Sequence, residues 1–217
     1  MELATLRRNY LNMKRLSLLC RLALTFSTVA MANIIPSNTG VIPTGANYTW
    51  TYDFSVAFDQ NVNSGPIPTS VLVSPLDLVT GGFVTIYDFN GYVAGSCAGP
   101  AGWTCTAQNV GFTPSNVVPA DSASVVNLTW IYTSGSPIVG SANVTGFSAV
   151  SNYSLPEQVT FTSRGWRNQG QQIGTITDNI GLTTGPTPTP EPATLALFGS
   201  GLLAGAFRLK SAWATKR

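Results

Sequence analysis

The side chains that could do chemistry in this 217-residue chain are few, because the chain contains no histidine. Ser-His-Asp and Cys-His nucleophile systems both depend on that base, and histidine is also the commonest zinc ligand. A few carboxylates and two cysteines remain in the middle of the chain. We therefore expect no nucleophilic triad, no metal site and no cofactor, and we predict that the protein is not an enzyme.

Paired carboxylates are the one catalytic arrangement that this composition leaves open. A glycosidase needs two of them facing one cleft. Asp53 and Asp59 lie about 20 Å apart if the strand rises about 3.3 Å per residue, which is too far. Other acids could converge through folding, so a secreted polysaccharide hydrolase stays as the alternative; its candidate acids are Asp77, Asp88, Asp121, Glu157 and Asp178.

One acid opens the sequence Asp88-Phe89-Asn90-Gly91, which resembles the start of a calcium-binding loop. The downstream ligands and the closing Glu of such a loop are missing. Asn-Gly is a strong turn signal. The four residues therefore predict a turn and not a calcium site.

A second patch, Arg164, Trp166 and Arg167, carries the only basic residues between positions 33 and 185. Two guanidinium groups beside an indole could hold an anionic sugar, with Trp103 and Tyr92 as further stacking platforms. In the alternative interpretation the arginines neutralise nearby acids and Trp166 belongs to the core. We give the alternative more weight and keep the three residues as a tentative ligand patch.

Cys97 and Cys105 bracket a loop of turn-forming residues. They are the two cysteines that remain once the N-terminal segment described below is removed, and an even count in an oxidising compartment predicts a disulfide. A thiol pair that binds metal is the alternative, and it lacks any histidine partner.

The sequence predicts strands in the region between the two chain ends. Tyr48, Trp50, Tyr52, Phe54, Val56 and Phe58 alternate with small or polar residues, which is typical of a half-buried strand over 48–58. Further strands are predicted at 71–73, 83–89, 126–132, 144–150, 159–163 and 172–177, with turns at 81–82, 90–91, 134–135 and 179–181. With no amphipathic helix among them, these strands predict an all-β domain, a single antiparallel β-sandwich or jelly roll.

Charge is segregated along the chain. Seven acidic residues and two arginines lie between positions 33 and 185, whereas most basic residues cluster near the two ends. A mildly acidic domain repels phosphate backbones, so nucleic-acid binding is excluded as a function class. The basic ends flank apolar stretches and indicate membrane topology signals.

The N-terminal segment is typical of a secretion signal. Lys14 and Arg15 precede a short apolar run, and Ala30-Met31-Ala32 supplies small residues at the cleavage positions. We predict a signal helix in residues 1–32, cleavage after Ala32, and Asn33 as the new N-terminus, with Met13 as an alternative start to Met1. An uncleaved membrane anchor is the alternative.

The C-terminal segment has three parts. Residues 183–192 form a Pro- and Thr-rich linker, 193–207 a short apolar helix, and 208–217 a basic tail. Fifteen helical residues span about 22 Å, so the transmembrane helix is short for a bilayer core of roughly 30 Å. The residues that should stay cytoplasmic and fix the topology are Arg208, Lys210, Lys216 and Arg217.

Pro190-Glu191-Pro192, a short Gly- and Leu-rich helix and a basic end, in that order, resemble the PEP-CTERM sorting signal. That resemblance covers residues 188–217 and implies recognition by exosortase, a membrane-embedded peptidase, with cleavage close to the tripeptide. It also implies a link to exopolysaccharide. An ordinary tail anchor without cleavage is the alternative.

The sequence thus predicts an exported, non-enzymatic cell-surface or matrix protein. Its domain should span 33–182, and its partners should be the secretion machinery, an exosortase-like peptidase, the membrane at least transiently, and extracellular polysaccharide.

Overall fold

The computed structural model describes residues 33–65 and 81–188. Within these ranges the chain forms strands and one short 3-10 helix. Their bounds are β1 Ile34–Thr44, β2 Asn47–Val56, β3 Gln60–Val62, β4 Phe83–Ile86, β5 Trp103–Gln108, β6 Asn127–Tyr132, β7 Ile138–Val139, β8 Ala142–Ser151, β9 Leu155–Arg167, η1 Gly170–Gln172 and β10 Ile176–Thr187.

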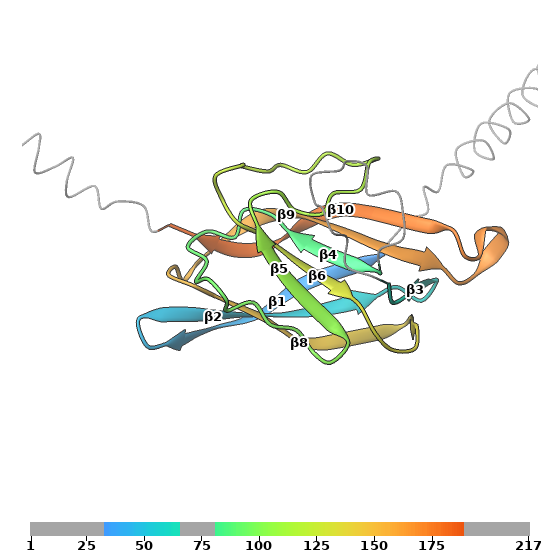
Figure 1. Ribbon diagram of the computed structural model, residues 1–217, viewed down its shortest axis with the longest axis horizontal. Coiled ribbons are helices and arrows are strands. Elements are labelled where there is room, and N and C mark those ends of the chain that lie inside the picture. The colour runs from blue at the N-terminus through green and yellow to red at the C-terminus, as the bar shows by residue number, and fades with distance from the viewer. Residues whose placement is uncertain (1–32, 66–80, 189–217) are drawn as a thin grey trace, which may run out of the picture. The chain divides into compact units, whose positions relative to one another are not determined.

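The strands form two antiparallel sheets (Figure 1). The smaller sheet has the order β1-β2-β8. The larger has the order β5-β6-β4-β9-β3-β7, and β10 pairs with β9 along its whole length. Because β4 and β3 pair with successive parts of β9, β10 takes the opposite side of that strand and forms an edge. The all-β expectation with two antiparallel sheets is confirmed.

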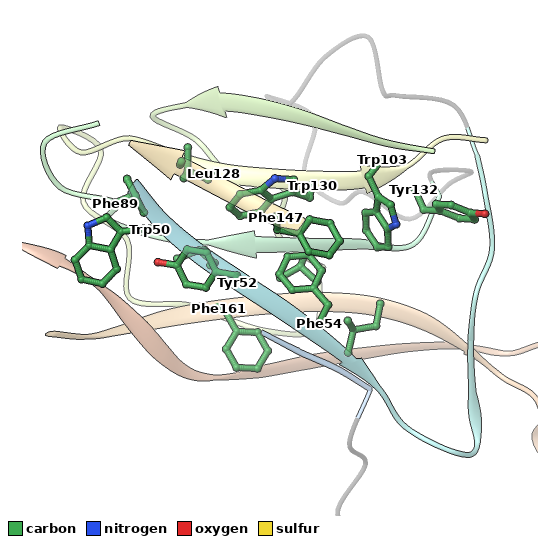
Figure 2. Close-up of a cluster of buried hydrophobic side chains, with 14 of the residues drawn as sticks. Trp50, Tyr52, Phe54, Phe89, Trp103, Leu128, Trp130, Tyr132, Phe147 and Phe161 are labelled. Carbon is green, nitrogen blue, oxygen red and sulfur yellow. The ribbon is translucent and has the colours of Figure 1, made fainter. Parts of the chain in front are cut away.

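The core lies between the two sheets, and β2 supplies its centre. Trp50, Tyr52 and Phe54 are fully buried, as the alternating pattern predicted. Phe54 stacks on Phe147 of β8 with 3.7 Å between ring centroids, and its edge meets Trp130 of β6 at 5.7 Å. Figure 2 shows these rings filling the space between the sheets. Offset and edge-to-face contacts of this kind stabilise a core beyond the area they bury.

The predicted strand at 48–58 ends early. β2 stops at Val56, and a turn follows in which Gln60 N donates to Ala57 O at 3.0 Å. Phe58, expected on the inward face, is therefore 63% exposed. The alternation that predicts a strand holds only while the backbone stays extended.

Strand β6 is buried on both faces, although its apolar residues Leu128, Trp130 and Tyr132 alternate with Asn127 and Thr129 as in a half-buried strand. The segment that connects β5 to β6 accounts for the difference, because its Phe112 packs against Phe83 and Ile131 on the outer face of the larger sheet. The Phe112 carbonyl also accepts hydrogen bonds from the hydroxyls of Thr85 (2.9 Å) and Tyr87 (3.0 Å). Burial raises the pKa of Tyr87 to about 12, so this hydroxyl stays protonated.

The C-terminal strand overturns part of the predicted linker. β10 runs to Thr187, so residues 183–187 belong to a sheet and not to a spacer. The sequence did not predict a strand at 183–187 because Gly185, Pro186 and the threonines around them are typical of loops. Edge strands tolerate such residues, since one side of the backbone needs no partner strand.

The predicted position of the neighbouring strand, at 172–177, was also wrong. Gln172 ends the helix η1, and β10 begins at Ile176. The predicted turn at 179–181 lies inside β10. Gly181 occurs there because the Phe161 ring lies 2.7 Å from where a Cβ would stand. This glycine therefore marks a close contact within a strand.

Several predicted segments lie outside the described residues: the signal helix, the strand at 71–73, the apolar helix at 193–207 and the basic tail. Within residues 33–65 and 81–188, no helix is long and apolar enough to cross a membrane.

Candidate functional site

The tentative ligand patch is divided between the two faces of β9. Side chains alternate along a strand, so Arg164 and Trp166 share one face and Arg167 lies on the other. Arg164 is 2% exposed and forms a two-pronged ion pair with Asp178, with Nε–Oδ1 at 2.7 Å and Nη2–Oδ2 at 3.0 Å. Its guanidinium also lies 5.7 Å from the centre of the Phe83 ring. These contacts leave Arg164 little surface for a sugar.

Arg167 has a carboxylate partner of its own. Its Nη1 donates to Asp59 Oδ2 at 2.8 Å, and both side chains are mostly buried. The two arginines thus neutralise acids on opposite faces of one strand. The geometry favours the interpretation in which these residues are structural.

The predicted pairing of the two cysteines is confirmed. Cys97 and Cys105 form a disulfide with a Cα–Cα distance of 5.9 Å, within the usual range. Cys105 lies in strand β5. Trp103 begins that strand, is 8% exposed and packs against Phe54, so it is a core residue and not a sugar platform.

A pocket of about 290 Å³ is the candidate site that the structure adds. It lies between the turn after β4, the segment before β6 and the first half of β9. Two carboxylates, from Asp88 and Glu157, line it together. The other lining residues are Asn90, Ala120, Ser122, Val125, Gln158, Val159 and Thr160.

Asp88 is held in this pocket by an uncommon backbone conformation. Its φ of 53° lies in the left-handed region, where Asp and Asn are the best tolerated residues after Gly. Ser122 N donates to Asp88 Oδ1 at 2.9 Å. The buried Asn127 links two acids, because its Oδ1 accepts from Asp88 N at 2.8 Å and its Nδ2 donates to Asp121 Oδ1 at 2.9 Å.

These surroundings change the pKa of the Asp88 carboxyl group. Burial raises the pKa of Asp88, and the nearby Asp121 charge raises it further, while the hydrogen bond from Ser122 opposes both. A carboxyl that keeps its proton to higher pH can act as a general acid, and a second carboxylate in the same cleft can act as a base. This arrangement suits acid–base chemistry or hydrogen bonding to a polyhydroxylated ligand.

The pairing of Asp88 with Glu157 could not be predicted from the sequence, although both were candidates. They are brought together only because β9 passes the turn that follows β4. Of the other candidate acids, Asp178 is committed to Arg164, and Asp77 lies outside the described residues. In residues 33–65 and 81–188, no group of three or more His, Cys, Asp or Glu side chains is placed to hold a metal ion.

The predicted processing sites flank the described body. Ala30 and Ala32 precede it, and Asn33 is its first residue, 1% exposed, with its side-chain amide donating to Thr177 O. The sorting tripeptide Pro190, Glu191 and Pro192 follows the last described residue, Pro188, as do the topology residues Arg208, Lys210, Lys216 and Arg217.

Strand β10 ends at Thr187, and a family model of the PEP-CTERM protein-sorting motif matches residues 188–211. This protein carries a PEP-CTERM sorting motif. The match begins at the residue after the last strand, so the PEP-CTERM signal and the β body are adjacent and do not overlap. A search of curated proteins found no match to the chain. The PEP-CTERM motif implies an exported protein that exosortase-type machinery sorts to the cell surface.

Proposed function

We propose that the protein is a non-enzymatic cell-surface or extracellular-matrix component, secreted through an N-terminal signal and processed at its PEP-CTERM tail. The observation that carries this proposal is the order of its parts. A folded β body ends at Thr187, and the sorting motif begins at residue 188. The apolar segment 193–207 would hold the precursor in the membrane until an exosortase-type peptidase releases the ectodomain.

The described surface supports a structural role. The lack of histidine removes most nucleophile systems, and both arginines of the body are ion-paired. Exposed Thr, Ser and Asn side chains, together with the pocket that Asp88 and Glu157 line, suit association with extracellular polysaccharide through many weak hydrogen bonds.

The export proposal is tested with the full chain in a bacterium that has an exosortase-type peptidase. Glu191→Gln keeps the size of the side chain but removes the charge of the tripeptide. We expect the variant to accumulate in the membrane fraction while the wild type is released. The matched control is Asp53→Asn, an acid of the ectodomain that accepts a hydrogen bond from Asn143, and it should be released normally. Equal release of wild type and Glu191→Gln contradicts the proposal.

A second candidate function, a polysaccharide hydrolase, is favoured by one observation: Asp88 and Glu157 share a pocket, and the pKa of Asp88 is raised. Release of reducing ends from a panel of polysaccharides tests it. Activity in the wild type that is lost in both Asp88→Asn and Glu157→Gln would replace the non-enzymatic proposal. No release by the wild type removes this candidate.

A further inference from the structure

The last residues of β10 are attached to three different strands. Thr183 is 5% exposed, and its Oγ1 donates to Pro36 O of β1 at 2.9 Å. The buried Tyr52 of β2 donates its hydroxyl to Thr184 O, also at 2.9 Å. At Gly185, a methyl of Val159 lies 2.9 Å from where a Cβ would stand. Pairing with β9 continues to the final residue, Thr187, opposite Leu155.

Very little chain separates this attachment from the sorting tripeptide. Pro190 is the third residue after Thr187, and an extended chain spans at most about 3.3–3.6 Å per residue. The Cα atoms of Thr187 and Pro190 therefore lie within about 11 Å of each other. A peptidase that cuts near Pro190-Glu191-Pro192 must work directly beside the folded sheets. Figure 1 shows that the C-terminal end of β10, which leads to the tripeptide, lies at the opposite end of the strand from the β9–β10 turn.

Peptide-binding clefts commonly take their ligand as an extended segment, because the backbone of the ligand supplies the hydrogen bonds. Residues 183–187 cannot enter such a cleft while they pair with β9 and are held by Pro36 and Tyr52. Only Pro188 and Thr189 are available on the N-terminal side of the tripeptide.

We propose that the end of β10, held by Thr183 and Tyr52, is a positioning element for tail processing that limits the segment accessible to the sorting peptidase to Pro188 onward. This inference rests on the proposed function. It assigns the ectodomain a role in its own sorting: the folded strand sets where the extended substrate begins. It also means that cleavage at the tripeptide leaves the whole sheet intact.

The experiment shortens the available segment in the full chain. Deletion of residues 188 and 189 places the tripeptide directly after β10, so binding to the peptidase must unpair the end of the strand. We expect processing at least about tenfold slower than in the wild type, since several buried hydrogen bonds must open. Insertion of a flexible Gly-Ser segment after Thr187 should leave processing at least as fast as in the wild type.

A rescue variant separates this effect from loss of sequence recognition. Thr183→Val keeps the shape of the side chain but removes the bond to Pro36, so in the deletion background it should speed processing about fivefold, the effect of one buried hydrogen bond. The matched control is Thr175→Val, just before the start of β10, whose hydroxyl donates to Gln172 O, and it should rescue nothing. Resistance of the ectodomain to added protease checks that each variant is folded.

Three results overturn the proposal: processing of the deletion variant at the wild-type rate, equal rescue by Thr183→Val and Thr175→Val, or slower processing of the insertion variant. If the wild type itself is never processed, the proposed function fails, and the positioning role fails with it.

Discussion

Thr183 in the last strand donates its hydroxyl to the carbonyl of Pro36 in the first strand, at 2.9 Å. Near the same end of β1, the side-chain amide of Asn33 donates to the Thr177 carbonyl of β10, and Ser163 Oγ of β9 donates to Ile34 O at 2.7 Å. The first residues after the predicted signal are thus joined to the strand that leads to the sorting motif. These hydrogen bonds join the start of the smaller sheet to β9 and β10 of the larger sheet.

Removal of the disulfide should destabilise the ectodomain moderately. Cys97 and Cys105 are eight positions apart, and closing so short a loop restricts the unfolded chain enough to stabilise the folded state by roughly 2–3 kcal/mol. We expect the double variant Cys97→Ser/Cys105→Ser to lose that amount in urea denaturation. Wild type treated with reductant should match the double variant, and no loss in either would contradict the structural role.

The Arg164–Asp178 pair should be costly to break from one side. The two side chains are 3% and 9% exposed, so Asp178→Asn leaves a buried guanidinium without its carboxylate and should cost about 3 kcal/mol. The more accessible Arg167–Asp59 pair, tested by Asp59→Asn, should cost less. Denaturant unfolding measures both. A larger loss for Asp59→Asn than for Asp178→Asn would show that the burial argument ranks them incorrectly.

Truncation of two phenylalanines four residues apart should change the stability of the protein by very different amounts. Phe54→Ala removes a ring stacked between the sheets and should cost about 3–5 kcal/mol. Phe58→Ala removes a ring that is 63% exposed and should change stability by less than about 0.5 kcal/mol. Thermal or urea unfolding of the two variants gives the comparison, and similar losses would mean that β2 extends past Val56.

Asp88 should make stability depend on pH. Its pKa in the folded protein is raised above the ordinary 3.8, so the unfolded chain loses this proton at lower pH than the folded protein does. The Asp88 contribution to stability is therefore full below the ordinary pKa and declines as pH rises through the folded pKa. Asp88→Asn, which also tolerates the positive φ, should show less decline between acidic and neutral pH in denaturation curves. An unchanged pH profile would remove the predicted titration.

The sequence predicted those elements whose side chains alternate regularly. Trp50, Tyr52 and Phe54 placed β2 correctly, because a half-buried strand repeats every two residues. The same rule missed β1, where Pro36 and Pro43 interrupt the pattern. These prolines are accommodated because β1 is an edge strand with β2 as its one ladder partner.

The candidate site was harder to predict than the core. The disulfide followed from the two cysteines left after the predicted signal is removed and from the oxidising compartment, and the sorting motif followed from the order of its parts. The pocket depends on tertiary contacts between Asp88, Ser122 and Glu157, which lie on three separate segments. Similarly, the partners of Arg164 and Arg167 became evident only once β9 was paired with β10 and β3.

Export as proposed removes both terminal segments of the protein, and mass spectrometry of the protein released by the cell tests this directly. We predict a chain that begins at Asn33, ends close to Pro190-Glu191-Pro192 and keeps the Cys97–Cys105 disulfide. A released protein that still carries the tail from Phe207 to Arg217, or a chain found only in the membrane with that tail intact, would contradict the account.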